Sequence, residues 1–580
     1  MTDLSLQHLP FSSYGSWLSL SPLQHRTDKV DETDTLYLRS HHGTRPGVIK
    51  AFLQLKPITK AASKVQVTPA AVRWSGADGG SVEICYDTPR SLRLRGWGMG
   101  LTLTPCYESV LFEQEGRLVL NVFEVSRKYV LEALQGGLEA RGTWRASAEE
   151  HAEQDARITL QPDDTGVWEL ALHEVQSTFV PEPYRDFAEC RARAEQSFRS
   201  WHAATPPAPT KWHDARHVAS YLTWSAVVNP EGLLQRPAVL MSKNWMSSVW
   251  SWDQCFNALA LARLDSKLAW DQMLLMSDFQ DEFGCYPDAV NDVEVIYNFT
   301  KPPIHGWTVS ALLERTQPPE ETLQTMYESL SRWTDWWLTY RVLPGEALPY
   351  YLHGNDSGWD NSTAFDEGVP LMTPDLSAYL ILQMNALAEL ANRLDKPDGA
   401  DWRRKANHLQ KSLLNELWQG DHFAAKHASG KLVYSQSLLH HLPIVLAKLL
   451  PRNVLDALEE NIAGFLTDHG LATERPDSAA YQADGYWRGP IWAPSTYLVV
   501  KGLETSGFNE LARDVAERFC ATCAASGFAE NFDALSGEGL RDRAYTWTAS
   551  VFLLLAESLA ERNREPNSLP EKPIENVKPF

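Results

Sequence analysis

The chain has 580 residues, a formal net charge of -21 and 22 tryptophans. A single hydrophobic core seldom grows to this length, so we expect two domains, or one large helical domain with an attachment. The acidic balance disfavours nucleic acid and anionic membranes as partners, because neither would attract such a chain at long range. A neutral or weakly charged small ligand is the better expectation.

Cysteine usage and the N-terminus both favour a reducing compartment. The seven cysteines show no spacing typical of a disulfide framework, and Cys520-Ala-Thr-Cys523 is a single CxxC pair inside an apparent helix. The first residues lack a charged segment followed by an apolar one, and no run of about 18 apolar residues occurs in the sequence. We therefore expect a soluble, cytoplasmic protein.

The N-terminal part has a strand-like pattern. Between about residues 34 and 180, short apolar runs alternate with turns rich in Gly, Asp and Pro. The runs are Leu36–Leu38, Val82–Ile84, Leu92–Arg95, Leu118–Leu120 and Val167–Leu172. Residues 1–200 are therefore predicted to form an N-terminal β-sandwich domain.

A proline-rich linker is predicted at residues 201–210, and beyond it the apolar period changes from two to about 3.6. Helices are predicted near 211–228, 253–264, 266–280, 306–316, 319–342, 374–394, 400–418, 434–450, 453–466, 492–504, 508–525 and 545–562. No sequence repeat of roughly 20 to 50 residues is visible, which favours a closed toroid of helical hairpins over a solenoid. The fold class is thus predicted as mainly α, with a helical domain at 211–563 and a loose tail at 564–580.

The segment Gly354-Asn-Asp-Ser-Gly-Trp-Asp-Asn-Ser362 has the composition of a functional site. It combines two carboxylates, two amides and an indole, a set that core packing alone does not select. Thr373-Pro374-Asp375 downstream supplies a capping hydroxyl, a proline at the first helical position and an acid in the first turn. The polar segment is therefore predicted to be a loop between two helices.

A second motif runs from Asn244 to Asn257. Trp250, Trp252 and Asp253 lie in it, just before or at a predicted helix start. An indole that stacks on a pyranose, beside a carboxylate that accepts from the sugar hydroxyls, is a natural sugar contact. The alternative is a tryptophan-rich helix seam capped by Asp253.

A third motif, Lys301-Pro-Pro-Ile-His-Gly-Trp307, follows Tyr286-Pro-Asp288. The paired prolines impose an extended path before the next helix and can direct Lys301, His305 or Trp307 toward a ligand. The alternative is a rigid turn with a capping histidine.

The fourth motif pairs Tyr486-Trp-Arg-Gly-Pro-Ile-Trp492 with Phe528-Ala-Glu-Asn-Phe-Asp533. Arg488 is the strong cation of the first string and can orient a carboxylate or bind a substrate hydroxyl. Glu530 supplies a carboxylate in the second. Together with the Gly354 loop, this motif suits a mechanism that uses two carboxylates.

These motifs resemble, in their order, those of glycoside hydrolase family 63. The strings that carry the resemblance are Ser251-Trp-Asp253, Lys301-Pro-Pro303, Ser357-Gly-Trp-Asp-Asn-Ser362, Tyr486-Trp-Arg-Gly-Pro-Ile-Trp492, Glu530 and Tyr545-Thr-Trp-Thr548. That group contains inverting α-glucosidases and hydrolases of glucosylglycerate and mannosylglycerate, with trehalases more distantly similar. The resemblance covers about residues 211–562, and Tyr14-Gly-Ser-Trp17 is similar to N-terminal attachments on such enzymes.

The resemblance implies an (α/α)6 barrel in which Asp360 is the general acid and Glu530 the general base. Trp252 and Asp253 would line the subsite of the glycosyl ring. Thr363 departs from the family pattern, in which proline often follows Asp-Asn-Ser, and this departure concerns the aglycone more than the chemistry. The other residues expected to contact substrate are Trp250, Lys301, His305, Trp307, Asp356, Trp359, Asn361, Tyr486, Trp487, Arg488, Trp492 and Trp547.

Hydrolysis with inversion makes opposite demands on the two carboxyls. Asp360 must be protonated, so a raised pKa is expected from burial beside Trp359 and from acids such as Asp356. Glu530 must be ionised to activate water, and we expect it to remain charged. A separation of roughly 6.5–9.5 Å leaves room for that water, whereas about 5 Å would indicate a retaining nucleophile.

The predicted activity is the exo-acting, inverting hydrolysis of a non-reducing terminal α-glucosyl residue in a small α-glucoside or oligosaccharide. The alternatives are a mannosylglycerate or glucosylglycerate hydrolase and a trehalase-like enzyme. Asp356 is the rival acid, and Asp533 and Glu538 are the rival bases. No cofactor is expected, because no His/Cys cluster has metal-ligand spacing and no EF-hand pattern occurs. A structural Ca²⁺ held by loop carboxylates and the oligomeric state stay open.

Two alternatives of other classes stay open as well. A sugar epimerase or lyase on a helical toroid would need a histidine or tyrosine as base, and His305, His353 and Tyr486 are available. A carbohydrate-binding protein with an inactive site would hold sugar without an aligned acid pair.

Overall fold

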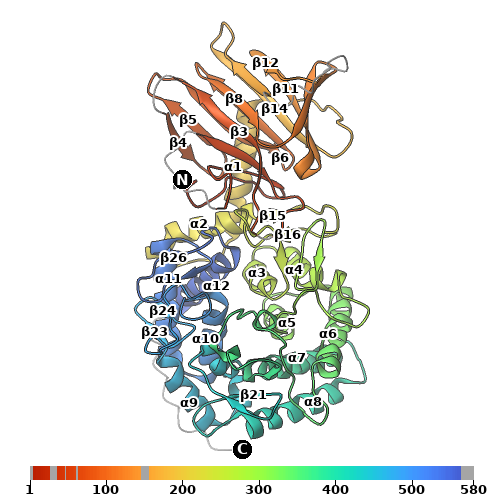
Figure 1. The fold of residues 1–580 in the computed structure, drawn as a ribbon, viewed down its shortest axis with the longest axis vertical. Coiled ribbons are helices and arrows are strands. Elements are labelled where there is room, and N and C mark those ends of the chain that lie inside the picture. Colours follow the sequence, from red (N-terminus) through yellow and green to blue (C-terminus); the bar gives the residue numbers. More distant parts are fainter. Residues whose placement is uncertain (1–3, 27–34, 46, 60–62, 145–155, 563–580) are drawn as a thin grey trace, which may run out of the picture.

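The computed structural model describes residues 4–26, 35–45, 47–59, 63–144 and 156–562. The tail predicted at 564–580 lies outside these residues. The described chain has two parts, a β-rich N-terminal part and a helical C-terminal part (Figure 1). The prediction of a mainly α chain therefore describes the C-terminal part alone.

Two antiparallel sheets make up the N-terminal part. The six-stranded sheet has the order β1 (Leu18–Ser21), β2 (Leu36–Ser40), β3 (Lys50–Ile58), β8 (Gly100–Pro105), β13 (Arg157–Gln161) and β12 (Gly137–Arg141). The eight-stranded sheet has the order β4 (Ser63–Val67), β5 (Val72–Gly76), β6 (Ser81–Thr88), β7 (Ser91–Trp97), β14 (Val167–Val175), β11 (Arg127–Gln135), β10 (Arg117–Val122) and β9 (Ser109–Gln114).

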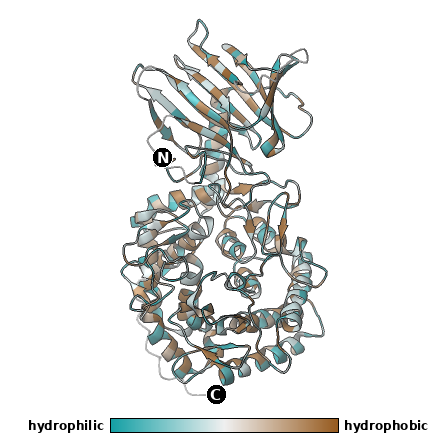
Figure 2. Ribbon diagram, in the orientation of Figure 1, coloured by the Kyte–Doolittle hydropathy of each residue, from teal (hydrophilic) through white to brown (hydrophobic). Residues whose placement is uncertain are grey.

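Alternation along the strands explains how these sheets pack. In β8, Leu101 and Leu103 are fully buried, whereas Thr102 and Thr104 are half-buried, because neighbouring side chains of a strand point to opposite faces. Side chains of both sheets belong to one hydrophobic core. Figure 2 shows hydrophobic residues spread over the strands and over the helices below them.

A helix that the sequence analysis did not predict, α1 (Phe187–Ala204), follows the sheets. Asp186 caps its first turn by accepting from the Ala188 amide, and buried residues recur along it at helical spacing. The helix packs against β6 and α2. The linker predicted at 201–210 therefore begins within the last turn of a helix.

The C-terminal part consists of an inner and an outer set of helices. The inner elements are α3 (Asp253–Leu261), α5 (His305–Leu313), α7 (Pro374–Arg393), η7 (Leu438–Leu449), α10 (Ala493–Ser506) and α12 (Thr546–Arg562), and each contacts two others of the set, so that they close a ring. The outer elements, each in contact with that ring, are α2 (His213–Ser225), α4 (Ser266–Asp278), α6 (Glu320–Tyr340), α8 (Gly399–Ser412), α9 (Arg452–Ala463) and α11 (Asn509–Ser526) (Figure 1). The twelve helical segments predicted after residue 211 correspond to these elements.

Short pieces of secondary structure occupy the loops. Strands of two or three residues are β15 (Val227–Val228), β16 (Ala238–Val239), β17 (Val249–Trp250), β18 (Ala289–Val290), β19 (Val295–Ile296), β20 (Leu371–Met372), β21 (Ala425–His427), β22 (Leu432–Val433), β23 (Leu466–Thr467), β24 (Gly470–Leu471), β25 (Asn531–Phe532) and β26 (Gly539–Leu540). Short helical turns are η1 (Phe123–Val125), η3 (Thr210–Trp212), η4 (Gly354–Ser357), η5 (Thr363–Phe365) and η6 (Leu413–Leu417). Over the described ranges, no helix is both long enough and apolar enough to cross a membrane.

The N-terminal ends of the inner helices meet at one end of the ring. Trp252, just before α3, lies 5.8 Å from Trp547 at the start of α12, measured between ring centroids. His305, the first residue of α5, donates from Nε2 to the Ser251 carbonyl at 3.0 Å. The loops that carry the sequence motifs therefore converge at this end.

Candidate active site

The Gly354–Ser362 loop is held in place by Asp356. This carboxylate accepts hydrogen bonds from the amides of Thr300 at 3.0 Å and Leu352 at 2.9 Å, and pairs with Arg341 at 2.8 Å. Burial alone would raise the pKa of Asp356, but Arg341 and the backbone donors lower it overall. Asp356 is therefore a charged anchor of the loop, and its contact with substrate stays a prediction.

Asn361 and Arg488, also predicted to bind substrate, connect two loops. Asn361 donates from Nδ2 to the Gly485 carbonyl at 3.0 Å and accepts from the Trp487 amide at 3.0 Å. Arg488 donates from Nε to the Asn361 carbonyl at 2.7 Å and pairs with Asp366. These bonds fix the Tyr486–Trp492 segment beside the Gly354 loop.

Asp360, the predicted acid, lies between these anchors and is half-buried. Burial raises its pKa; Asp288 raises it further, and Lys301 opposes the shift. Lys301 pairs with Asp288 at 2.9 Å and donates to the Asn355 carbonyl, also at 2.9 Å, so it ties the third motif to this loop. The direction of the Asp360 shift is the one that a general acid needs, although the neighbouring acid is Asp288 and not Asp356.

Glu530, the predicted base, is 5% exposed. Its amide donates to the Asp542 carbonyl at 2.7 Å. Burial raises the pKa of Glu530 to about 7; Asp542 adds to the shift, and Arg541 and Arg26 oppose it. The raised pKa of Glu530 runs against the expectation that this carboxyl stays charged, because the sequence could not show how deeply it is buried.

Tyr486 feels the charge of both carboxyls. Its pKa is raised strongly by burial and then by the charges of Glu530 and Asp360. The backbone of Tyr486 has a φ of 63°, a left-handed conformation that is uncommon outside glycine. The Arg541 guanidinium lies 4.9 Å from the Tyr486 ring centroid. One phenol thus responds to the charges of both acid-bearing loops.

Asp253 is the third buried carboxyl of this site. It is 4% exposed, and its Oδ2 atom accepts no hydrogen bond from the described part of the chain. Burial raises the pKa of Asp253 well above its ordinary value, Lys301 opposes the shift, and Asp360 adds to it. A buried carboxyl oxygen without a partner is costly, so it is suited to meet a ligand hydroxyl.

Five tryptophans predicted to bind substrate form one cluster and are at most 3% exposed. The rings of Trp487 and Trp492 stack at 4.1 Å, and Trp359 lies 4.7 Å from Trp487. Trp252 and Trp547 complete the cluster. Trp547 Nε1 finds no acceptor within the described ranges. The cluster therefore forms a packed wall, in which the Trp547 donor is a buried polar atom without a partner among the described residues.

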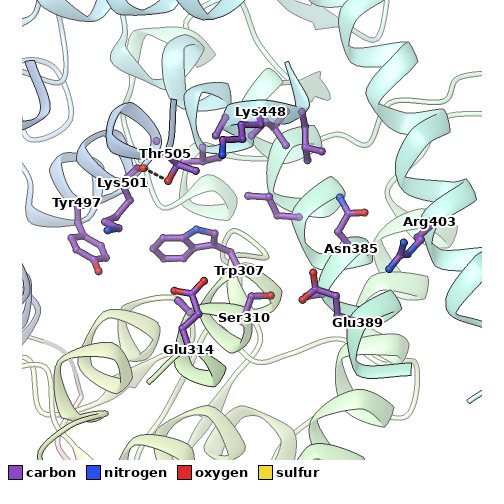
Figure 3. A pocket seen from close by; sticks show the side chains of 18 of the residues that line it. Trp307, Ser310, Glu314, Asn385, Glu389, Arg403, Lys448, Tyr497, Lys501 and Thr505 are labelled. Atoms are coloured by element: carbon purple, nitrogen blue, oxygen red, sulfur yellow. Dashed lines mark hydrogen bonds between the residues drawn. The ribbon is translucent and has the colours of Figure 1, made fainter. Parts of the chain in front are cut away.

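Trp250, His305 and Trp307 have three different surroundings. Trp250 is half-buried and pairs through its backbone with Ala289 of β18. His305 is 1% exposed, and burial lowers its pKa to about 4, so it is a neutral ring that supports Ser251. Trp307 lines a cavity whose walls come mainly from inner helices (Figure 3). The contact of Trp307 with substrate stays a prediction.

The structure adds residues that the sequence analysis had not chosen. Asp288 and Asp542 are buried, and the pKa of each is raised first by burial. Asp542 accepts from Asn244 Nδ2 at 2.9 Å, and its Oδ2 atom has no hydrogen-bond partner in the described chain. Tyr545 is 3% exposed, and after burial the charge of Glu530 raises its pKa most. Asp288 and Tyr545 belong to the motifs Tyr286-Pro-Asp288 and Tyr545-Thr-Trp-Thr548, so the sequence offered a signal for both.

Buried carboxyls with raised pKa values are able to exchange protons with a bound ligand. Among the described residues, no group of three or more His, Cys, Asp or Glu side chains is placed to hold a metal ion.

Comparison with known families gives a match over residues 246–548 to the mannosylglycerate hydrolase MGH1-like glycoside hydrolase domain. The mannosylglycerate hydrolase MGH1 of Selaginella moellendorffii is 22% identical over 387 residues, which are 52% of this chain and 79% of the relative. The glucosylglycerate hydrolase of Mycolicibacterium hassiacum is 22% identical over 404 residues, 53% of this chain and 91% of the relative.

Two solved structures share the fold. The GH63 mannosylglycerate hydrolase of Thermus thermophilus, in complex with Tris and D-glycerate, matches with a TM-score of 0.52 and 19% identity over 58% of this chain and 99% of its own. A bacterial glucoamylase complexed with acarbose matches with a TM-score of 0.60 and 12% identity over 96% of this chain and 94% of its own. The second match extends over both parts of the present chain.

Proposed function

The chain belongs to the mannosylglycerate hydrolase MGH1-like glycoside hydrolases, and from this premise we propose that it hydrolyses a small α-glycoside with inversion of the anomeric carbon. Asp360 and Glu530 are the two carboxyls of this proposal. The observation that carries it is that the Tyr486–Trp492 segment is bonded both to the Asp360 loop, through Asn361, and to the Glu530 segment, through the bridge between Ile491 and Phe532.

In the proposed reaction Asp360 donates its proton to the glycosidic oxygen as the bond to the anomeric carbon breaks. Glu530, once ionised, takes a proton from a water molecule that attacks the opposite face of the sugar ring. Burial favours the protonated form of Asp360, and Arg541 and Arg26 favour the ionised form of Glu530. Asp253 and Trp547 hold the atoms suited to bind sugar hydroxyls.

In the proposed architecture, hydrolysis takes place in the helical part of the chain. The double ring of helices is an (α/α)6 catalytic barrel, and the two sheets are a β-sandwich attached to it; the likeness to the glucoamylase over both parts supports this reading. A site in the cytoplasm is consistent with seven cysteines that are all free thiols.

Mannosylglycerate and glucosylglycerate are the first substrates to test. The relatives are named after these two substrates. Both have glycerate as the leaving group, and they differ in the sugar. A neutral α-glucoside, the expectation from the sequence alone, is the second candidate, and a trehalase-like activity the third.

The deciding experiment incubates the protein with mannosylglycerate, glucosylglycerate, trehalose, kojibiose, nigerose, maltose and isomaltose, and follows the first sugar released by ¹H NMR. The β-anomer released first from one of these α-glycosides establishes inversion. The α-anomer released first would replace the inverting mechanism by a retaining one, and binding without hydrolysis would favour the inactive-site alternative.

A further inference from the structure

A second cavity lies at the end of the helical ring opposite the carboxyls. It has a volume of about 760 Å³, a size typical of small-molecule sites. Its walls come from α5, α7, η7 and α10, and from one face of α8. Figure 3 shows the Trp307 indole in the middle of the lining residues, with Ser310 and Glu314 on one side and Thr505 and Lys448 on the other.

A column of aromatic rings separates this cavity from the site that contains Asp360 and Glu530. Trp252, in the tryptophan cluster, lies 5.8 Å from Phe256, and Phe256 lies 6.3 Å from Tyr497. Tyr497 in turn lies 6.0 Å from Trp307, with the two ring planes at 70°. Phe256 and Tyr497 are buried, so the ring of helices is filled along this line and the two ends are distinct sites.

The charged side chains of the cavity balance one another. Arg315 pairs with Glu557 at 3.0 Å, and Lys501 with Glu504 at 2.6 Å, although Glu557 also pairs with Arg263 and Glu504 with Arg562. The remaining charged residues that line the cavity, and that form no hydrogen bond or ion pair within the described part of the chain, are Glu314, Glu389, Arg403 and Lys448. Two carboxylates and two cations leave no net charge, which disfavours a phosphate, a polyanion or a simple cation as ligand.

The uncharged lining has the chemistry that a sugar ring requires. Trp307 is half-buried and offers an indole face, and Tyr497 borders it. Asn385, Ser310 and Thr505 add amide and hydroxyl groups around this ring. An aromatic face surrounded by neutral donors and acceptors, with carboxylates that accept from hydroxyls, matches a pyranose, which has an apolar face and an equatorial belt of hydroxyl groups.

We propose that this cavity is a second, non-catalytic binding site for a neutral saccharide, in which a pyranose ring stacks on Trp307. The site would retain an oligosaccharide on the enzyme at the end of the ring where no hydrolysis occurs. The proposal does not depend on which glycoside is cleaved at the other end, nor on the roles given to Asp360 and Glu530.

The test compares binding by four proteins, all with the Glu530→Gln substitution so that turnover does not consume the probe. The probes are maltotriose and mannotriose, titrated by calorimetry, and each complex is also crystallised to locate the sugar. The first protein carries no other substitution. The other three carry Trp307→Ala, Thr505→Trp or Trp144→Ala, and the last of these is the matched control, because it removes an exposed tryptophan far from the cavity. Thr505 is exposed at the end of α10, so a larger side chain there fills the cavity without disturbing the core.

We expect at least one trisaccharide to occupy the cavity in the crystal, and its dissociation constant to rise by about tenfold or more in both Trp307→Ala and Thr505→Trp. Trp144→Ala should bind as the parent does. With Glu530 restored, Thr505→Trp should hydrolyse a small α-glycoside at the wild-type kcat/KM. Equal affinities in all four proteins, or sugar seen in the crystal at the carboxyl end alone, would overturn the proposal. Continued hydrolysis by Glu530→Gln would instead count against the proposed function.

Discussion

At the scale of single residues, the ionic and hydrogen-bond partners of a buried carboxyl decide how it behaves. Asp356 and Asp360 stand in one loop, yet the pKa of Asp356 is lowered by Arg341 and its backbone donors, while burial raises that of Asp360. The two roles follow from local partners, as expected when environment sets the protonation state of a carboxyl. By composition alone, Asp356 and Asp360 are equally good candidates for the general acid, and their hydrogen bonds distinguish them.

Removing either reacting carboxyl tests the assignment directly. We expect Asp360→Asn and Glu530→Gln each to lower kcat/KM by roughly 10³-fold or more on whichever α-glycoside is the substrate, since each removes a proton-transfer group. Thermal melting should show both variants folded. Retention of half the wild-type activity by either variant would remove that residue from its proposed role.

The pH profile of kcat/KM tests the raised pKa of Glu530. A base with a pKa of about 7 is mostly protonated below that pH, so the rising limb of the profile should have its midpoint near pH 7, and the falling limb reports the raised pKa of Asp360. The measurement is initial rate at low substrate concentration across the pH range. A midpoint of the rising limb near pH 4.5 would show that Glu530 is not held in the buried setting seen here.

At the scale of elements, the sequence predicted the helices well and their orientation poorly. The 3.6-residue period located the helical segments after residue 211, because each buries an apolar stripe against its neighbours. Residues two positions apart in a helix, such as His305 and Trp307, lie about 200° apart around its axis and so face different surroundings. The period alone could not show which surroundings each of them faces. Helix α1 was missed even though Asp186 is a typical cap, since the neighbouring strands suggested a continuing β region.

The anchoring of the Gly354 loop can be measured as stability. Asp356→Ala leaves Arg341, whose side chain is 13% exposed, without its partner and frees two backbone donors, so we expect a loss of about 3 kcal/mol in the free energy of unfolding. Activity should fall with it, because Asp360 lies in the same loop. Urea denaturation followed by tryptophan fluorescence gives the value.

A matched pair near this loop provides the control. Asp366 pairs with Arg488, but its side chain is 49% exposed, so Asp366→Ala should change stability by less than about 1 kcal/mol. Equal losses in the two variants would show that the loop does not depend on the buried Asp356 pair.

At the scale of the whole molecule, the two parts of the chain share their interior, which no local pattern reveals. Side chains from the sheets and from the ring of helices belong to one hydrophobic core. Asn244 donates to Asp542 and to the His8 carbonyl, so the N-terminal residues are tied to the neighbour of Glu530. Motif reading located Asp360 and Glu530 within the helical part; it could not show that the N-terminal part helps to build their surroundings, because such contacts join residues hundreds of positions apart.

This shared interior predicts that the full chain unfolds as one unit. Trp17 is 2% exposed and donates from Nε1 to the Asn229 carbonyl at 3.0 Å, and Tyr221 donates to the Pro10 carbonyl at 2.9 Å, so neither part can open without breaking buried contacts of the other. Differential scanning calorimetry should show a single transition whose calorimetric and van't Hoff enthalpies agree, even though chains of this size often unfold in steps. Trp17→Ala should lower the midpoint of that whole transition, because it removes a buried ring and a hydrogen bond at the boundary. Two resolved transitions in the wild-type chain would mean that the sheets and the helical ring are stable separately, and the contribution of the N-terminal part to the setting of Glu530 would then be dispensable for folding.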